Sequence, residues 1–251
     1  MPAHYPERRA VPSSFPGAPT HPACYPAHRP HSSPRAPMPI DVAQLRRDTP
    51  GVRDHIHLNS AGAALVSRQV LAAQIGHLEL EARVGGYQAA RDVAPQVQQV
   101  RVSLGRLLGA SADEIALLTS ATDAWNTIFL ALVDTLPRGA RILADRALYG
   151  SHAITLLHTC QRLGCTLEVV DDNPNGELCL DDLDRRLQRP AAALACLTHM
   201  PTSSGLVNPI EAAGERCARA GVPLLLDACQ SVGQWPVDVR RLRCVALAGT
   251  G

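Results

Sequence analysis

The apolar stretch Leu224–Asp227 ends in a carboxyl group, which is therefore expected to be partly buried. A buried carboxylate is costly unless it is paired with a positive group. Asp227 could hold a metal ion, a ribose or a protonated ring nitrogen, and Gln230 supplies a side-chain amide nearby. A helix or turn cap is the alternative interpretation, and the residue pattern alone does not choose between them.

Residues 119–123 form a second candidate group, Thr-Ser-Ala-Thr-Asp, which leads into a predicted helix over residues 124–133. The first turn of a helix offers backbone N–H groups and the positive end of the helix dipole, and small hydroxylated side chains add donors. This combination suits a phosphate group. An ordinary Thr or Asp helix cap is the alternative, and spacing alone favours that cap.

Two more polar loops follow predicted strands. Residues 198–205 contain His199 and Thr202, and a lone histidine in such a loop is more often structural than catalytic. Residues 145–152 contain Tyr149. The aromatic residues after position 38 are only Tyr87, Trp125, Phe129, Tyr149 and Trp235. A flat cofactor that needs an aromatic face would find one in Tyr149, which follows a predicted strand.

Short apolar segments alternate with helical patterns over most of the chain. The predicted strands are 115–119, 141–145, 166–170, 192–198 and 222–227, with a short extended stretch at 55–58. Helix ends are indicated by Ser67, Gly85-Gly86, Asn208-Pro209, Gly164 and Gly221. Apolar strands that alternate with helices indicate an α/β fold, with a mostly parallel sheet and helices on both faces. Such sheets bind ligands at the carboxyl ends of their strands.

The first 38 residues differ from the rest of the chain. They are rich in proline, histidine and arginine, and Glu7 is the only acidic residue before Asp41. Such a segment cannot bury enough apolar surface to offset its ordering entropy. We therefore predict a disordered segment over residues 1–38 and a folded domain over residues 39–251. The histidines of the first segment are irregularly spaced, and no metal site is predicted.

All 24 basic residues are arginine, so the chain contains no lysine. This excludes a Walker-type P-loop, whose lysine contacts the phosphates. The formal net charge of +1 gives no basic surface for nucleic acid, and no apolar run reaches the ~18 residues of a membrane span. The eight cysteines form no CxxC or His/Cys ligand pattern. We therefore expect reduced thiols and a cytoplasmic protein.

No GxGxxG motif follows a predicted strand, which argues against a dinucleotide site, and no GxSxG turn points to a hydrolase. The candidate groups fit pyridoxal 5'-phosphate better. They combine a phosphate cup at 119–123, a strand-end carboxylate at Asp227, a glutamine at Gln230 and a stacking ring at Tyr149.

Together these residues resemble the class V aminotransferases, the fold-type I pyridoxal-phosphate enzymes that include cysteine desulfurases, isopenicillin-epimerase-like proteins and C–S lyases. The resemblance covers residues 55–251. Residues 57–62, His-Leu-Asn-Ser-Ala-Gly, look like the family's opening strand and glycine turn. Residues 84–90 are similar to a GGYxAA segment of the epimerase-like and C–S-lyase branch, and Asp227 and Gln230 match the DxxQ pair.

The resemblance implies a role for each candidate residue. Asp227 would keep the pyridine nitrogen protonated, which makes the ring an electron sink, and Gln230 would bind the phenolate oxygen. Ala121 and Thr122 match the phosphate-binding pair, and Tyr149 matches the position of a ring-stacking residue.

Thr202 takes a position where many desulfurases carry asparagine, and Thr250 matches a phosphate-contacting residue just before the lysine motif. His199 would lie behind the residues that touch the cofactor. The residues implied at the substrate are Asn59, Ala61 and Gly62.

The family's Schiff-base lysine lies a few residues after the strand that matches residues 244–248, whereas this chain has no lysine and stops at Gly251. No catalytic residue is therefore assigned, and none of the cysteines matches the desulfurase nucleophile. The resemblance implies a large domain that is incomplete at its C-terminus, without the small C-terminal domain.

Two hypotheses follow. The chain is a fragment, inactive alone, of a pyridoxal-phosphate enzyme that acts on an amino acid by transamination, epimerisation or C–S bond cleavage, and the full-length protein is a homodimer. Alternatively, it is a non-catalytic remnant that binds the cofactor or assists assembly.

Overall fold

The computed structural model describes residues 40–250, so the predicted disordered segment 1–38 lies outside the described residues. The chain divides into two units, residues 1–42 and 43–251, and the site lies in the second. Within the described residues, no helix is both long enough and apolar enough to cross a membrane.

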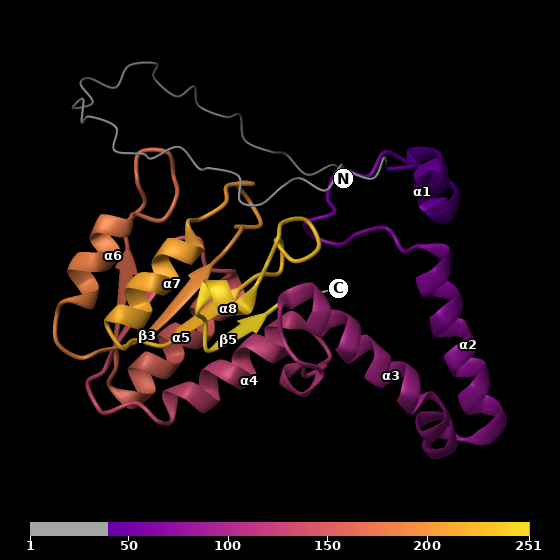
Figure 1. Ribbon diagram of the computed structural model, residues 1–251, viewed down its shortest axis with the longest axis horizontal. Helices are drawn as coiled ribbons and strands as arrows, with labels where there is room; N and C mark the ends of the chain where they lie inside the picture. Colours follow the sequence, from indigo (N-terminus) through magenta and orange to yellow (C-terminus); the bar gives the residue numbers. More distant parts are fainter. Residues whose placement is uncertain (1–39, 251) are drawn as a thin grey trace, which may run out of the picture. The chain divides into compact units, whose positions relative to one another are not determined.

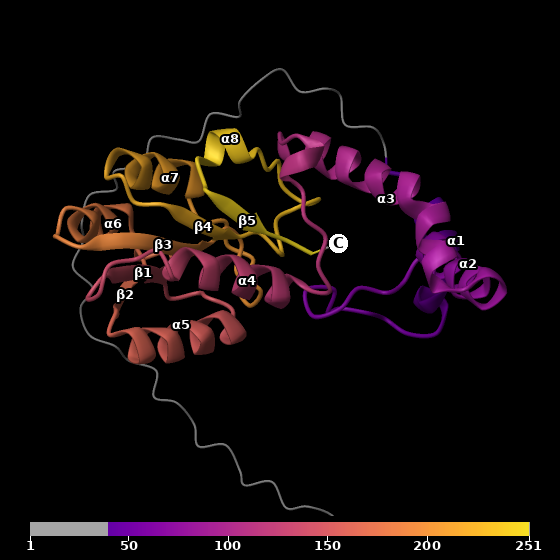
Figure 2. The ribbon, with the colours of Figure 1, turned by 90° about the horizontal axis from the view of Figure 1, so that it is seen from below.

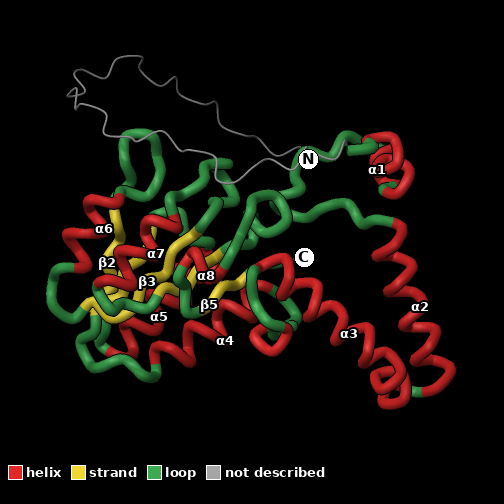
Figure 3. The backbone as a smooth tube through the Cα atoms, viewed as in Figure 1, coloured by secondary structure: helices red, strands yellow, loops and turns green. Residues whose placement is uncertain are grey.

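The described part of the second unit contains a five-stranded sheet in the order β2-β1-β3-β4-β5 (Figures 1 and 3). The strands are β1 (Arg141–Asp145), β2 (Thr166–Val170), β3 (Ala192–Thr198), β4 (Leu224–Asp227) and β5 (Ala246–Ala248). Every pairing is parallel. The predicted α/β fold is confirmed, and three predicted strands have the predicted bounds. The carboxyl ends of all the strands meet at one edge of the sheet, as parallel pairing requires.

Helices cover both faces of this sheet, as Figure 2 shows. One face carries α6 (Leu180–Leu187), α7 (Ile210–Arg219) and α8 (Val239–Leu242), and the other carries α4 (Ala121–Val133) and α5 (Gly150–Leu163). Successive strand residues point to opposite faces. Leu143 accordingly packs into the α6–α7 core, while Ile142 and Ala144 pack with Trp125 and Phe129 of α4. Burial on both faces explains why the central strands β1, β3 and β4 consist largely of apolar residues.

The chain before the sheet is helical. It contains α1 (Val42–Asp48), a 3-10 turn (Pro50–Arg53), α2 (Arg68–Val84), α3 (Gly86–Leu108) and a second 3-10 turn (Ala112–Glu114). The predicted cap is present at Ser67, whose side chain accepts a hydrogen bond from Val70 N. Gly85, with φ +81°, ends α2 and separates it from α3. Only glycine adopts this backbone conformation readily.

Two predictions of local structure are wrong. Residues 115–119 are not a strand: they have no sheet partner in the described chain, and Leu117 is 44% exposed. Residues 55–58, predicted as a short extended stretch, belong to no helix or strand. Asn208 does not cap α7, where Pro209 takes the cap position. Its buried amide instead accepts from Leu178 N and donates to Thr198 O, both at 2.8 Å. These tertiary hydrogen bonds outweigh the local capping preference of asparagine.

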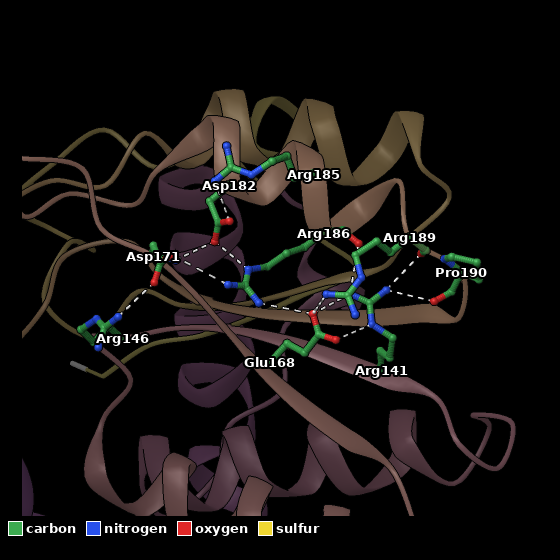
Figure 4. A network of polar contacts seen from close by, with 9 residues as sticks. All are labelled: Arg141, Arg146, Glu168, Asp171, Asp182, Arg185, Arg186, Arg189 and Pro190. Carbon is green, nitrogen blue, oxygen red and sulfur yellow. Dashed lines mark hydrogen bonds and ion pairs between the residues drawn. The ribbon is translucent and has the colours of Figure 1, made fainter. Parts of the chain in front are cut away.

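A polar network connects the edge strand β2 to β1 and α6 (Figure 4). Glu168 of β2 accepts two 2.7 Å hydrogen bonds from Arg141 and further ones from Arg186 and Arg189. Arg141 also donates to the carbonyls of Arg189 and Pro190 at 3.0 Å. The Arg141 guanidinium, despite partial burial, holds the pKa of Glu168 below its usual value. Because Glu168 is paired on several sides, the network ties the edge strand to the rest of the sheet.

Candidate functional site

Three polar side chains meet where β1, β3 and β4 end. Asp145, at the end of β1, accepts hydrogen bonds from both the backbone N–H and the hydroxyl of Thr198 at the end of β3. The backbone N–H of His199 donates to the Asp227 carbonyl at 2.8 Å, which joins β3 to β4. Asp145, Thr198 and Asp227 are all buried. The strand ends therefore form a buried polar floor, as the parallel sheet predicts.

Asp227 is the central acid of this floor and is 5% exposed. One carboxylate oxygen accepts a 3.0 Å hydrogen bond from Cys229 N, and the other lies 3.3 Å from Nδ1 of His152. Burial raises the pKa of Asp227, but His152 and the Cys229 N–H outweigh burial, so its pKa lies below the usual value. Asp227 is therefore a carboxylate at neutral pH. Asp145 behaves differently, because burial raises its pKa to about 7.

A column of rings stands beside Asp227. Trp125 stacks on Phe129 with ring centroids 5.0 Å apart, and on its other side His152 stacks at 4.2 Å and 11°. Tyr149 meets His152 edge-on at 5.7 Å and 66°. Tyr149 is 51% exposed. The column thus runs from the buried core of α4 to an accessible aromatic face at the start of α5.

The first turns of α4 and α5 lie next to each other. Thr122 Oγ1 is 3.2 Å from Ser151 Oγ, and the Ser120 side chain caps α4 by accepting from Asp123 N at 3.1 Å. Ala121 is the first residue of α4. The first N–H groups of a helix have no acceptor within that helix, and the dipole there is positive. Ala121 and Thr122 are thus placed where an anion can be bound.

Gln230 connects the end of β4 to the loop that carries the predicted substrate residues. Its Nε2 donates to Ala61 O at 3.0 Å. In that loop, Asn59 Oδ1 accepts from Gly62 N at 3.2 Å. A Cβ at Gly62 would lie 2.7 Å from Asn59 Nδ2, so a larger residue there would displace the Asn59 side chain. The structure therefore brings the loop to Gln230, although these residues are far apart in sequence.

The other predicted site residues are not joined to Asp227 by any side-chain hydrogen bond in the described chain. Thr202 lies in an exposed turn after β3, and Thr250 is exposed after β5. His199 is buried, its Nδ1 has no hydrogen-bond partner within the described residues, and burial lowers its pKa. A neutral His199 suits the structural role that was expected of a lone histidine in this loop.

Sequence reasoning missed His152 and Asp145 as site residues. Both lie in the polar segment 145–152, in which the sequence pointed only to Tyr149 as a cofactor-stacking residue. The signal for His152 was its helical spacing from Tyr149 in a chain with few rings, since residues at i and i+3 share a helix face.

The cysteines and acids offer no metal site in the part of the chain that the structure describes, and several of the thiols are buried. No group of three or more His, Cys, Asp or Glu side chains there could hold a metal ion. The seven described cysteines are free thiols. Burial raises the pKa of Cys160 to about 11 and that of Cys217 to about 12, and burial together with Asp227 raises that of Cys229. These thiols remain protonated at neutral pH and are poor nucleophiles.

A parallel sheet with polar groups at its strand ends is the architecture of fold-type I pyridoxal-phosphate enzymes, and solved structures show this fold. The apo cysteine desulfurase from Thermococcus onnurineus NA1 matches with a TM-score of 0.76 at 22% identity, over 85% of this chain and 53% of that one. A C-DES mutant with glycine covalently linked to its PLP cofactor matches with a TM-score of 0.75 at 20% identity, over 82% and 55%.

The chain belongs to the aminotransferase class-V family, whose model matches residues 56–250. A probable cysteine desulfurase from Pyrococcus abyssi is 24% identical over 217 residues, which are 85% of this chain and 53% of that protein. The resemblance found in the sequence is thus confirmed, and the family is cysteine desulfurase-like. The chain spans about half the length of the relatives it matches.

Proposed function

We propose that this chain is the cofactor-binding part of a pyridoxal-phosphate enzyme that acts on an amino acid. The observation that carries the proposal is Asp227, a buried acid that stays ionised at the carboxyl end of β4. A buried carboxylate favours a positively charged hydrogen-bond donor. The protonated ring nitrogen of pyridoxal phosphate is such a donor, so the chemistry of this site fits the cofactor.

The surrounding groups fit the rest of the cofactor. The N–H groups of Ala121 and Thr122, with the Thr122 hydroxyl, would bind the phosphate at the start of α4. The half-exposed ring of Tyr149 would cover one face of the pyridine. A glutamine amide has two N–H donors, so Gln230 can donate to the phenolate oxygen as well as to Ala61 O.

When bound, pyridoxal phosphate supplies an electron sink for the negative charge that develops on an amino acid. In that arrangement Asp227 would hold a proton at the ring nitrogen, and the buried polar floor would exclude water from that nitrogen. Since these 251 residues contain no lysine, they would hold the cofactor without a covalent bond.

The substrate and assembly follow from the same proposal. We place the amino-acid substrate beside the Asn59 loop, with Ala61 and Gly62, because Gln230 already links that loop to the site. Thr250 would add a phosphate contact, Thr202 would approach the phenolate oxygen and His199 would support the site from behind. Transamination, epimerisation and C–S cleavage share these residues. We further propose a homodimeric, cytoplasmic whole protein.

A second function, binding without catalysis, is favoured by one specific observation. The chain has no lysine, and burial raises the pKa of the thiols Cys217 and Cys229. Both functions require cofactor binding, but only the enzyme consumes a substrate. Release of sulfide or a keto acid from L-cysteine by the loaded protein supports the enzyme, whereas binding without product supports the second function.

Equilibrium dialysis of pyridoxal phosphate against the 251-residue chain tests the shared requirement. Asp227→Asn removes the charge that pairs with the ring nitrogen, and we expect about tenfold weaker binding or more. Asp172→Asn is the matched control, because Asp172 follows the edge strand β2, which β1 and β3 separate from β4, and pairs with the exposed Arg146. Equal binding by all three proteins, or binding by none, would contradict the proposal.

A further inference from the structure

His152 has no role in the proposed function so far, yet it is among the most buried polar side chains of the described chain. Its side chain is 2% exposed and its Nδ1 lies 3.3 Å from Oδ2 of Asp227, whose side chain is 6% exposed. Neither ring nitrogen makes a hydrogen bond of good geometry within the described residues, and the approach of Nδ1 to Asp227 is a charge contact rather than such a bond. A buried imidazole without another partner requires an explanation beyond packing.

The ring column fixes the orientation of His152. Parallel stacking on Trp125 at 4.2 Å holds the plane of the imidazole, and Tyr149 meets it edge-on at 5.7 Å. Trp125 is itself held by Phe129. With its plane fixed on the first turns of α5, the imidazole can present Nδ1 to Asp227 without a further loss of side-chain freedom.

The charges around this pair favour an ionised Asp227. Asp145 on β1 faces Asp227 and would repel it as a carboxylate, but burial keeps Asp145 largely protonated up to about pH 7. From the loop after β4, Cys229 contributes its N–H to Asp227, and its thiol stays protonated. His152 on α5 is the remaining titratable group that contacts Asp227. Of the two acids at the ends of β1 and β4, only the one beside His152 has a lowered pKa.

We propose that His152 is a positioning residue that orients the Asp227 carboxylate toward the ring nitrogen of the cofactor. The N–H of Cys229 donates to one carboxylate oxygen and Nδ1 of His152 lies 3.3 Å from the other, so the two groups together restrict the plane of the carboxyl group. Each oxygen keeps a second lone pair for a ligand. This inference rests on the proposed function, because it assigns His152 to the same cofactor site.

The test compares two ligands that differ at one atom. Pyridoxal phosphate has the ring nitrogen, whereas 1-deazapyridoxal phosphate has a C–H group in its place and cannot use Asp227. The ratio of their dissociation constants therefore measures the contact between Asp227 and the ring nitrogen, and general damage to the site cancels. Equilibrium dialysis of the 251-residue chain gives both constants without any need for activity.

Two substitutions and one control separate positioning from packing. His152→Phe keeps a ring on Trp125 but removes the N–H, and His152→Asn restores a neutral donor near the position of Nδ1. His158→Asn is the control, because His158 is exposed on the same helix. We expect the preference for pyridoxal phosphate to fall about tenfold in His152→Phe and to recover in part in His152→Asn, with no change in the control.

Each outcome has a distinct meaning. If the wild-type chain binds neither ligand, or binds both equally, the proposed function fails and this inference fails with it. If the wild-type chain prefers pyridoxal phosphate and His152→Phe keeps the full preference, only the role of His152 is overturned. If His152→Phe does not fold, as judged by its circular dichroism, the same ratio in His152→Asn decides, and an unchanged ratio overturns the inference.

Discussion

Replacing Asp145 by asparagine should stabilise the chain, although Asp145 is buried and hydrogen-bonded. Burial raises its pKa from the ordinary 3.8 to about 7, despite the hydrogen bonds from Thr198. Between these two values the folded chain keeps a proton that the unfolded chain has lost. Stability therefore falls as pH rises through this window and stays low above it. Asparagine removes the titration and can still accept the Thr198 N–H bond.

The size of the gain follows from the shift in pKa. A rise from 3.8 to about 7 costs about 4 kcal/mol at pH values above the window. We therefore expect Asp145→Asn to add about 4 kcal/mol near pH 8 and about 1.5 kcal/mol near pH 5. For a domain of this size, the gain near pH 8 corresponds to a rise of roughly 10 °C in Tm.

The assay is urea unfolding at both pH values, with Asp182→Asn as the matched control. Asp182 is equally buried, but Arg186, Arg185 and the Asp171 N–H outweigh the effect of burial and lower its pKa. The same substitution should therefore destabilise the chain there, by about 2 kcal/mol near pH 8. A loss of stability in Asp145→Asn near pH 8, or an equal gain at both pH values, would refute the reasoning.

Two further predictions concern the scaffold, and urea unfolding measures both. Glu168→Gln removes the charge from the β2 network and should lower the free energy of unfolding by about 3 kcal/mol. The control Glu211→Gln breaks a pair that is half exposed on both sides and should lower it by under ~0.5 kcal/mol. Equal effects would contradict the importance of burial. Gly214→Ala places a Cβ 2.0 Å from Leu242 O and should lower the free energy of unfolding by about 3 kcal/mol or more. The control Gly76→Ala in α2 places a Cβ with nothing within 4 Å and should raise that free energy by about 0.5–1 kcal/mol. A tolerated Gly214→Ala would contradict the close approach of α7 to α8.

Much of the sheet could be predicted because its central strands β1, β3 and β4 are largely buried on both faces. The strands at 141–145, 166–170 and 192–198 are bounded by polar or turn residues, although the edge strand 166–170 is partly exposed. Residues 115–119 have a similar composition but form no strand. What they lack is a pairing partner, and no property of the segment itself carries that information.

The site was predicted in outline from strand-end residues, because parallel strands bring their carboxyl ends together. The sequence therefore pointed to Asp227, Gln230 and Tyr149. It could not indicate that Gln230 donates to Ala61, or that His152 lies beside Asp227, because both contacts join distant segments through side-chain geometry. The difference in ionisation between Asp145 and Asp227 likewise depends on tertiary neighbours.

The protonation state of the bound ring nitrogen tests the central claim most directly. The measurement is a ¹⁵N NMR spectrum of pyridoxal phosphate labelled at the ring nitrogen, in the presence of excess protein, at a pH where the free cofactor has lost its ring proton. If Asp227 binds the ring nitrogen, the bound signal lies at the pyridinium position in the wild-type chain and at the pyridine position in Asp227→Asn. A pyridine signal in the wild-type complex would contradict the account.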